Sequence, residues 1–193
     1  LATRLGAANT LTRTTAGWAA RNTDVEGFLQ PLRDRVSRAG RTLTGLRVAV
    51  LGAGGAARAV VAGLAEAGAV PTVHARRREQ AEQLVRLGAR VGDAVPHPGT
   101  WDVLVNTTPV GTASHGAASD TTPIDADRLV GGGLVYDLVY NPGHTRLLRE
   151  AASAGCDTLG GLEMLIGQAA VQVSTWLGVA PPVDAMRAAI HAE

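Results

Sequence analysis

No lysine occurs in this sequence, and all 18 of its basic residues are arginine. Aromatic residues make up only 3% of the chain, so a hydrophobic core must be filled by valine, leucine and alanine. The single cysteine, Cys156, excludes an intramolecular disulfide and is compatible with a reducing compartment. No apolar run approaches the ~18 residues of a membrane-spanning helix, and no signal peptide is visible. These absences predict a cytoplasmic protein without a membrane partner.

An excess of charge of either sign is also missing. The formal net charge is +1, which argues against a basic surface that binds nucleic acid. The 193 residues suit one sizeable domain, or one domain with an appendage. Because the chain begins with Leu1 and not with methionine, we expect it to be a segment of a longer protein or a processed one.

Strand and helix patterns alternate regularly from residue 46 onward. Apolar runs rich in β-branched residues predict strands at 46–52, 71–75, 101–108, 133–140 and 156–161. Helical periodicity predicts helices from the glycines after the first strand to about residue 68, and at 78–88, 144–155, 162–178 and 181–193. The polar stretch 111–123 predicts a mobile surface loop. This alternation predicts a Rossmann-type α/β fold, with a doubly wound, mostly parallel sheet and helices on both faces.

The part of the chain before residue 46 has a different pattern. Residues 1–22 show alternation without a helical period, which predicts a β-hairpin of two short strands around a turn at Gly17. Residues 24–39 place their apolar side chains on one helical face. Pro31 lies inside this helix and predicts a kink or a late helix start.

Asp24 stands at the start of that helix, and two roles are open to it. Thr23 and Glu26 fit the capping-box template, and an acid in the first turn suits the helix dipole. In that case Asp24 needs no function. Alternatively, Thr23 and Glu26 cap the helix themselves, and Asp24 is a carboxylate directed into an active site.

A glycine-rich turn follows the first predicted strand of the sheet. Gly52, Gly54 and Ala57 fit the G-x-G-x-x-G/A form of dinucleotide-binding turns. Gly52 permits the tight turn, Gly54 has no Cβ to hold a pyrophosphate away from the backbone, and Ala57 lets the helix lie close to the strand. Free amide groups at the helix N-terminus then face the phosphates. A glycine-rich turn without a ligand is the alternative, but the agreement of strand, turn and helix favours dinucleotide binding.

The end of the second strand indicates which dinucleotide is bound. NAD-specific sites usually place there an acid that binds the ribose 2′-hydroxyl, whereas this sequence has Arg76, Arg77 and Arg78. Guanidinium groups bind phosphate through a forked pair of hydrogen bonds. A solvated basic helix start is the alternative, although cations are disfavoured at a helix N-terminus. The arginines therefore favour NADP.

Six stretches in the chain form a series with a consistent order and spacing. They are GAANT (6–10), NTD (22–24), GAGGAARAV (52–60), NTTPVG (106–111), YDLVYNP (136–142) and GGLEMLIGQAA (160–170). Each is weak alone, but together they resemble the shikimate dehydrogenase family across the whole chain. The family consists of NADP-dependent oxidoreductases that interconvert 3-dehydroshikimate and shikimate in aromatic amino-acid biosynthesis.

The resemblance implies roles for residues in these stretches. Asn9 and Asp24 would bind the substrate hydroxyls, with Tyr140 and Gln168 lining the same site, and Asp24 would pair with a catalytic lysine to handle the proton. The cofactor residues implied are Gly52, Ala53, Gly54, Gly55 and Ala56 at the pyrophosphate, Arg76 and Arg77 at the 2′-phosphate, and Leu138 and Gly161 near the nicotinamide. Structural roles are open for some of them, since Asn9 could fix a turn and Gln168 could be a polar residue on a helix face.

The resemblance also implies a division of the chain. Residues 1–23 would be a remnant of a substrate-binding domain, residues 24–160 a linker helix with the NADP-binding domain, and residues 161–193 the helices that close the cleft between them. The partners expected are the small-molecule substrate and a second copy of the chain in a homodimer. No metal site is expected, because the five histidines lack the spacing of metal ligands, and Cys156 is expected in the core.

The chain departs from the family in two places. Ala75 stands where the family usually has asparagine, so one adenosine contact is lost, for which the arginines would compensate. The family's catalytic lysine and serine-rich motif lie in a region that would precede Leu1, and arginine is a poor proton shuttle. We therefore expect the chain as given to bind NADP(H) with little or no turnover. A quinate or aminoshikimate dehydrogenase and a non-catalytic NADP-binding module are the alternatives.

Overall fold

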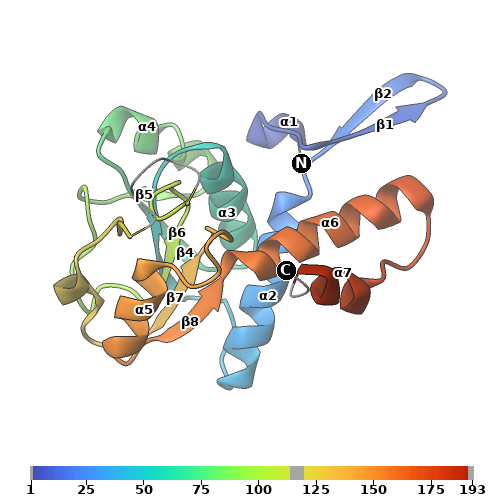
Figure 1. Cartoon of the computed structure of the whole chain (residues 1–193). Helices are drawn as coiled ribbons and strands as arrows, with labels where there is room; N and C mark the ends of the chain where they lie inside the picture. The colour runs from blue at the N-terminus through green and yellow to red at the C-terminus, as the bar shows by residue number, and fades with distance from the viewer. Residues whose placement is uncertain (1, 114–119, 191–193) are drawn as a thin grey trace.

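The computed structural model describes residues 2–113 and 120–190 (Figure 1). Its centre is a six-stranded sheet in the order β5-β4-β3-β6-β7-β8, with every pair of neighbours parallel. The strands are β3 (Arg47–Leu51), β4 (Val70–His74), β5 (Arg90–Val91), β6 (Val103–Asn106), β7 (Leu134–Asp137) and β8 (Asp157–Gly160). The order reverses between β3 and β6, which is the topological switch point of a doubly wound sheet. The predicted fold class is confirmed.

Helices surround this sheet and continue beyond it. They are α1 (Ala2–Leu5), α2 (Asp24–Arg38), α3 (Gly55–Glu66), α4 (Arg78–Glu82), α5 (Arg146–Ser153), α6 (Gly161–Leu177) and α7 (Val183–Ile190), with the 3-10 turns η1 (Val85–Leu87) and η2 (Ala126–Leu129). The prediction of one continuous helix at 78–88 is wrong, because a turn separates α4 from η1. The η1 segment then ends at Gly88, whose φ is +102°. Part of the predicted 111–123 loop, residues 114–119, lies outside the described residues.

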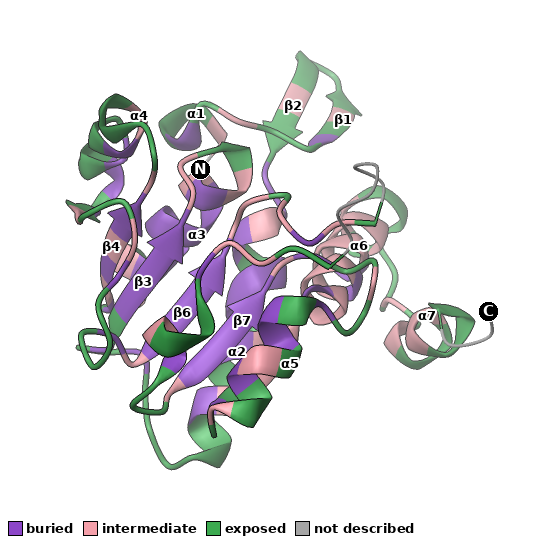
Figure 2. Ribbon diagram, turned by 60° about the vertical axis from the view of Figure 1, so that its left-hand side comes forward, coloured by how far each residue is buried: buried purple, intermediate pink, exposed green. Residues whose placement is uncertain are grey.

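The sheet separates two hydrophobic cores, one on each face. Along β3, Val48 and Val50 belong to one core, and Ala49 and Leu51 belong to the other. Helices α2 and α3 cover the first core, while α5 and η2 cover the second. Figure 2 shows the buried residues concentrated in the strands. Strands buried on both faces explain why their sequences are continuous apolar runs.

The N-terminal hairpin forms a second, two-stranded sheet that projects from the rest of the molecule (Figure 1). Strands β1 (Thr10–Thr14) and β2 (Gly17–Arg21) are antiparallel, with Thr14 paired to Gly17 at the turn. The predicted hairpin is confirmed, but the prediction of strand at its first residues is wrong. Residues Ala2–Leu5 form α1, where the side chain of Leu5 is fully buried in the core beside α3.

Helix α2 begins at Asp24 and continues through Pro31, so the predicted late start is wrong. Proline lacks the N–H that would bond the carbonyl of Gly27 one turn earlier. Gly27 lies where α6 crosses, and a Cβ built there would stand 2.6 Å from the backbone N of Gln168. A Cβ built at Gly167 would in turn stand 3.0 Å from the Cα of Gly27. The two glycines allow α2 and α6 to approach closely at this point.

Helix α6 connects the sheet to the hairpin. It begins directly after β8, crosses α2, and reaches β1, where Trp176 Nε1 donates to the backbone oxygen of Leu11 at 3.1 Å. Gln172 Nε2 donates to Thr10 Oγ1 at 3.3 Å. Within residues 2–113 and 120–190, none of the helices has the length and apolar character needed to cross a membrane.

Candidate functional site

The turn between β3 and α3 has the geometry of a phosphate-binding loop. Gly52 adopts φ +99°, and a Cβ there would lie 2.8 Å from Thr107 Oγ1 and 2.9 Å from Thr108 Cγ2, so a side chain does not fit. Gly54 is the N-cap of α3, no side chain caps this helix, and its first turn holds no acid. A Cβ at Gly54 or Gly55 would meet no atom within 4 Å. The amide groups of the first turn are therefore open to an anion.

A pocket of about 400 Å³ lies beside this turn, at the carboxyl ends of the central strands. Its lining residues are Ala56 from α3, Thr107, Thr108, Pro109 and Thr112 after β6, and Leu138, Val139, Tyr140 and Asn141 after β7. Ligands of doubly wound folds bind at this edge of the sheet, next to the switch point. The structure thus brings three predicted residues together here, Ala56, Leu138 and Tyr140.

Two of the three arginines that follow β4 have side chains without a partner among the described residues. The side chains of Arg76 and Arg77 are exposed and have no hydrogen-bond or ion-pair partner among the described residues. Arg78, by contrast, is the first residue of α4 and pairs with Glu82 at 3.2 Å. His74 precedes them and is buried, with Nδ1 2.9 Å from the backbone oxygen of Asp93. Of the three arginines, Arg76 and Arg77 are thus the two whose guanidinium groups are not engaged by the described residues.

Asp24 belongs to a second group of polar residues, between the hairpin and α6. Asn9 Nδ2 donates to Asp24 Oδ1 at 2.7 Å and to Thr23 Oγ1 at 3.0 Å. Thr23 Oγ1 also lies 3.4 Å from Gln168 Oε1 on α6. Three of the predicted substrate residues, Asn9, Asp24 and Gln168, are thus brought together through Thr23.

The capping box predicted for Thr23 and Glu26 is wrong. Thr23 adopts helical angles and makes no side-chain capping bond, because its hydroxyl is engaged by Asn9. The residue before Thr23 supplies a side-chain acceptor at this helix end: Asn22 Oδ1 accepts from the backbone N of Asp24 at 3.0 Å. Glu26 lies on the surface, with one oxygen 3.9 Å from a guanidinium nitrogen of Arg33.

Burial raises the pKa of Asp24 above its ordinary value, and hydrogen bonds from Asn9 and Asn22 partly offset this effect. Among the described residues no cation pairs with this carboxylate. A half-buried carboxylate whose bonded partners are neutral amides is suited to accept a hydrogen bond or a proton from a ligand. Asp24 is at the same time the first residue of α2.

Helix α6 fixes the distance between the two groups of residues. At its first residue, a Cβ built on Gly161 would lie 2.3 Å from the backbone oxygen of Leu138, so glycine is required for this contact. Gln168 is seven residues later, which corresponds to ~10 Å along a helix. Gln168, beside which Thr23 lies, therefore stands roughly this far along α6 from the contact with Leu138.

A buried polar network, which the sequence motifs did not predict, lies next to the pocket. Asn106 ends β6, Asp137 ends β7, and Thr145 precedes α5; each is 0% exposed. Asn106 Nδ2 donates to Asp137 Oδ1 at 2.9 Å, and Thr145 Oγ1 donates to Asp137 Oδ2 at 2.6 Å. A polar residue at the end of each of two apolar strands is the signal that could have identified this network.

The remaining reactive side chains lie apart from the site. Cys156 is buried in the second core with Sγ 3.3 Å from the backbone oxygen of Leu129, and burial raises the pKa of its thiol. The prediction that it is a core residue is confirmed. The described part of the chain contains no group of three or more histidine, cysteine, aspartate or glutamate residues that could hold a metal ion.

Known proteins resemble this chain in sequence and in structure. Residues 161–191 match the family described as the shikimate 5′-dehydrogenase C-terminal domain. A shikimate dehydrogenase (NADP(+)) of Thermosynechococcus vestitus is 38% identical over 205 residues, which cover 99% of this chain and 68% of that protein. The chain spans about two thirds of the length of the curated relatives it matches.

Solved structures agree with these relatives. A shikimate 5-dehydrogenase of Thermus thermophilus, described in complex with NADP(H) and shikimate, superimposes with a TM-score of 0.82 at 36% identity and covers 98% of this chain and 69% of that one. A quinate dehydrogenase of Corynebacterium glutamicum in complex with NAD reaches a TM-score of 0.85 at 30% identity and covers 100% of this chain and 70% of that one. The chain, with its glycine turn, its Asn9–Asp24 pair and its doubly wound sheet, belongs to the shikimate dehydrogenase family.

Proposed function

We propose that this chain carries the NADP-binding part, and some of the substrate residues, of an enzyme that reduces 3-dehydroshikimate to shikimate in the biosynthesis of chorismate and the aromatic amino acids. The observation that carries the proposal is the Asn9–Asp24 pair, which Thr23 holds beside Gln168. The amide of Asn9 holds one oxygen of the Asp24 carboxylate, and the other oxygen of that carboxylate can accept a hydrogen bond from a ring hydroxyl. The family to which the chain belongs supports the same substrate.

The residues of the glycine turn and of the β4 end fit an NADP molecule. Gly52 would shape the turn, because its own amide donates to the backbone oxygen of His74 at 2.9 Å. The amide groups of Ala53, Gly54, Gly55 and Ala56 would bind the pyrophosphate at the uncapped start of α3. Arg76 and Arg77 would bind the 2′-phosphate through their exposed guanidinium groups. Backbone groups of Leu138 and Gly161 would lie at the nicotinamide end, where the pocket is lined by Leu138. When bound, the cofactor supplies the hydride.

Asp24 would hold a substrate hydroxyl and accept its proton in the oxidative direction. The family resemblance pairs this carboxylate with a lysine, and the sequence has none. Arginine does not replace it, since a guanidinium group stays protonated at neutral pH. We therefore propose that the chain as given binds NADP(H) but turns over slowly or not at all. Robust shikimate-dependent NADP⁺ reduction by these 193 residues would contradict this part of the proposal.

Cofactor binding is tested by titrating the chain with NADPH and with NADH. We expect NADPH to bind more tightly, and the double change Arg76→Ala/Arg77→Ala to weaken NADPH binding by about tenfold or more, because charge-assisted hydrogen bonds to the 2′-phosphate are lost. Binding of NADH should change little. The matched control is Arg13→Ala, which removes an exposed arginine from β1. Equal affinities for the two cofactors in the unchanged chain would overturn the NADP assignment.

Two other functions remain as alternatives with their own support. The likeness to a quinate dehydrogenase favours a related ring substrate, and a panel of shikimate, quinate and aminoshikimate tested on the enzyme with its lysine-bearing region would separate these. A non-catalytic NADP-binding module is the other alternative. The retained Asn9, Asp24 and Gln168 argue against a module, because NADP binding alone does not need them.

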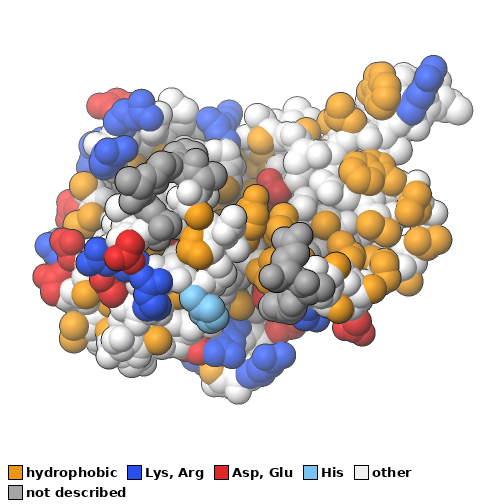
Figure 3. All heavy atoms as spheres, in the orientation of Figure 1, with side chains coloured by type: hydrophobic (Ala, Val, Ile, Leu, Met, Phe, Trp, Pro, Cys, Tyr) orange, Lys and Arg blue, Asp and Glu red, His pale blue; other side chains and the backbone are white. Residues whose placement is uncertain are grey.

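The hairpin and the C-terminal helices suggest how the chain is organised. Hydrophobic side chains gather on the surface over α6 and α7, whereas charged side chains gather over the sheet (Figure 3). Trp18 is 71% exposed and Trp176 is 52% exposed.

We propose that residues 1–23 belong to a substrate-binding domain, that residues 24–160 form the linker helix and NADP-binding domain, and that residues 161–193 close the cleft. A cytoplasmic homodimer is part of the same proposal, and sedimentation of the purified chain tests its oligomeric state.

A further inference from the structure

The two walls of the pocket begin at neighbouring positions on the sheet. One wall, residues 107–109, follows Asn106 at the end of β6, and the other, residues 138–141, follows Asp137 at the end of β7. Asn106 and Asp137 are partners in the parallel register. Whatever fixes these two residues to each other therefore fixes the separation of the walls.

The Asp137 carboxylate receives three hydrogen bonds from different parts of the pocket frame. Its Oδ1 accepts from Asn106 Nδ2 at 2.9 Å and from the backbone N of Val139 at 3.1 Å. Its Oδ2 accepts from Thr145 Oγ1 at 2.6 Å. One side chain thus binds the first wall, the second wall and the start of α5.

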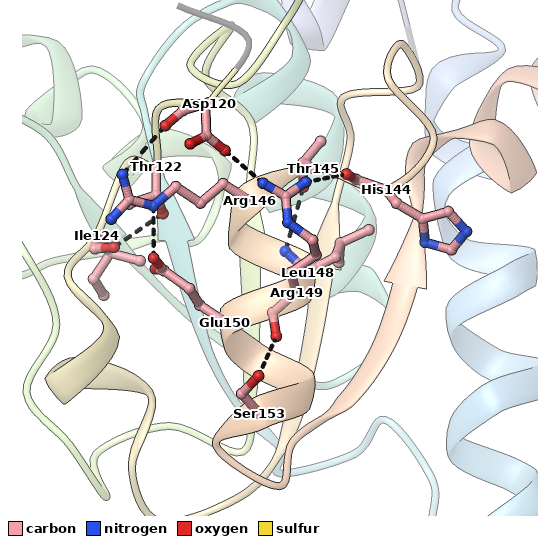
Figure 4. Close-up of polar contacts among 10 residues, drawn as sticks. All are labelled: Asp120, Thr122, Ile124, His144, Thr145, Arg146, Leu148, Arg149, Glu150 and Ser153. Carbon is pink, nitrogen blue, oxygen red and sulfur yellow. Dashed lines mark hydrogen bonds and ion pairs between the residues drawn. The ribbon is translucent and has the colours of Figure 1, made fainter.

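The bond to Thr145 extends the network into α5. Thr145 Oγ1 accepts from the backbone N of Leu148 at 3.3 Å and so caps this helix (Figure 4). Its hydroxyl hydrogen is then available for Asp137. Around this point Arg149 donates to the backbone oxygen of His144 and to Asp120, and Arg146 pairs with Glu150 (Figure 4).

On the β6 side of the pocket, Asn106 connects Asp137 to the first wall through hydrogen bonds. Its Oδ1 accepts from the backbone N of Thr108 at 3.0 Å and from Thr108 Oγ1 at 2.7 Å. Thr108 Oγ1 in turn lies 3.3 Å from the backbone N of Val110. Asn106 Nδ2 donates to Asp137 at 2.9 Å and more weakly to the backbone oxygen of Val110 at 3.4 Å. Asp137 is thus the nearer of the two groups that orient the amide to which Thr108 is bonded.

We infer that Asp137 is a positioning residue for the nicotinamide end of the cofactor: its carboxylate holds the walls that begin at Thr107 and Leu138 at the separation the ligand requires. A carboxylate suits this position because it is only an acceptor, and all three groups that converge on it are donors. No cation is among them. This inference rests on the proposed binding of NADP(H).

The test compares two ligands on the unchanged chain, Asp137→Ala and Asp137→Asn. NADPH reaches the pocket, whereas adenosine 2′,5′-bisphosphate carries the 2′-phosphate but no nicotinamide. We expect Asp137→Ala to weaken NADPH binding by about tenfold, the effect of one lost buried hydrogen-bonded group, and to leave bisphosphate binding within about twofold. Asp137→Asn should restore most of the NADPH affinity, since its amide oxygen can still accept from Asn106 and Val139.

The control is Asp102→Ala, which removes another carboxylate from the opposite, amino-terminal edge of the same sheet. Asp102 accepts from the backbone N and the guanidinium group of Arg47, so its loss should destabilise the fold without changing the affinity for either ligand. A variant Asp137→Ala that weakens both ligands equally, or neither, would overturn the inference. An Asp102→Ala variant with the same ligand pattern as Asp137→Ala would overturn it too.

Hydrogen exchange of the ligand-free chain separates this inference from the proposed function. We expect Asp137→Ala to speed exchange of the backbone amides of Thr108 and Val139 by tenfold or more relative to amides in β3, with partial recovery in Asp137→Asn. Failure of the unchanged chain to bind either ligand would refute the proposed function. Unchanged exchange at Thr108 and Val139 would refute the role of Asp137, whatever the ligands do.

Discussion

The two edges of the parallel sheet carry acids in opposite electrostatic settings. At the amino-terminal edge, Asp102 is bonded by Arg47 and Asp157 by Arg35, and these guanidinium bonds lower the pKa of both carboxyls. At the carboxyl-terminal edge, Asp137 is bonded only by neutral donors, and burial raises its pKa. The same residue type is therefore stabilised as an anion at one edge and penalised as an anion at the other.

The ion-paired carboxylates stabilise the fold, whereas the buried carboxylates without a cation belong to the candidate site. Exposed ion pairs at the amino-terminal edge cost little to form and stabilise the ends of strands modestly. A buried carboxylate without a cation is unfavourable for stability. Asp24, at the start of α2, shows the same raised pKa from burial. Both carboxyls whose pKa burial raises, Asp24 and Asp137, thus belong to groups of polar residues for which a ligand-binding role is proposed, as is typical of functional sites.

The largest difference between the two edges is expected at the two glycines that flank β3. Gly45 and Gly52 both have positive φ, +76° and +99°, but a Cβ at Gly45 would meet nothing within 4 Å. We expect Gly52→Ala to lower the free energy of unfolding by about 3 kcal/mol, from backbone strain together with overpacking against Thr107 and Thr108. We also expect it to weaken NADPH binding by about a hundredfold.

The matched variant Gly45→Ala should cost about 1 kcal/mol, from backbone strain alone, and leave NADPH affinity unchanged. Urea denaturation and cofactor titration measure the two quantities. Equal loss of NADPH affinity in both variants would show that the two edges are not functionally distinct.

A smaller effect is expected in the pH dependence of stability for Asp137. Because its folded pKa is raised, the folded chain binds more protons than the unfolded chain between pH 3.8 and that raised pKa, so its contribution to stability falls as pH rises through this window. Asp137→Asn lacks this dependence. The free energy of unfolding of Asp137→Asn minus that of the unchanged chain should therefore increase with pH across the window, as measured by urea denaturation.

The contribution of Asp102 to stability should change with pH in the opposite direction. Its folded pKa is lowered, chiefly by the side-chain hydrogen bond from Arg47, so its stabilisation is fully present above pH 3.8 and is lost as pH falls through the folded pKa. At pH 7 we expect Asp102→Asn to cost about 1 kcal/mol, as for a solvent-screened ion pair. If the difference in free energy of unfolding from the unchanged chain varied with pH in the same direction for Asp102→Asn and Asp137→Asn, the two carboxyls would not lie in opposite electrostatic settings.

The smallest effect is the response to salt. The destabilisation by Asp102→Asn should shrink by a few tenths of a kcal/mol in 1 M sodium chloride, because exposed charges are screened. The effect of Asp137→Asn should stay the same, since its partners are buried and neutral. Thermal denaturation of both variants at low and high salt measures this, and an equal salt response would argue that Asp137 is accessible to solvent.

The sequence predicted the order of strands and helices well where the patterns are long. The apolar runs of β3, β6 and β7 and the periodicity of α6 are strong local signals. β5 was missed because two residues, Arg90–Val91, carry no periodicity and pair only with β4. α1 was missed because four residues are too few for a helical period, and burial of Leu5 decides its shape.

The candidate site was predicted unevenly for a related reason. Gly52 and Gly54 are recognisable because the chemistry depends on consecutive residues with fixed spacing. The capping of α2 was misassigned because Asn9, fifteen residues before Asp24, competes for the hydroxyl of Thr23. No local pattern can report a bond between residues so far apart in the chain.

Local sequence was enough to predict the alternation of buried strands and helices, the glycine turn and the arginines that follow β4, because each depends on neighbouring residues. The meeting of Asn106, Asp137 and Thr145 next to the pocket depends on the folded structure. So does the meeting of Asn9, Thr23 and Gln168 around Asp24. These residues come from distant segments, and the parallel register of the sheet and the glycine crossing of α2 with α6 bring their polar groups within hydrogen-bonding distance.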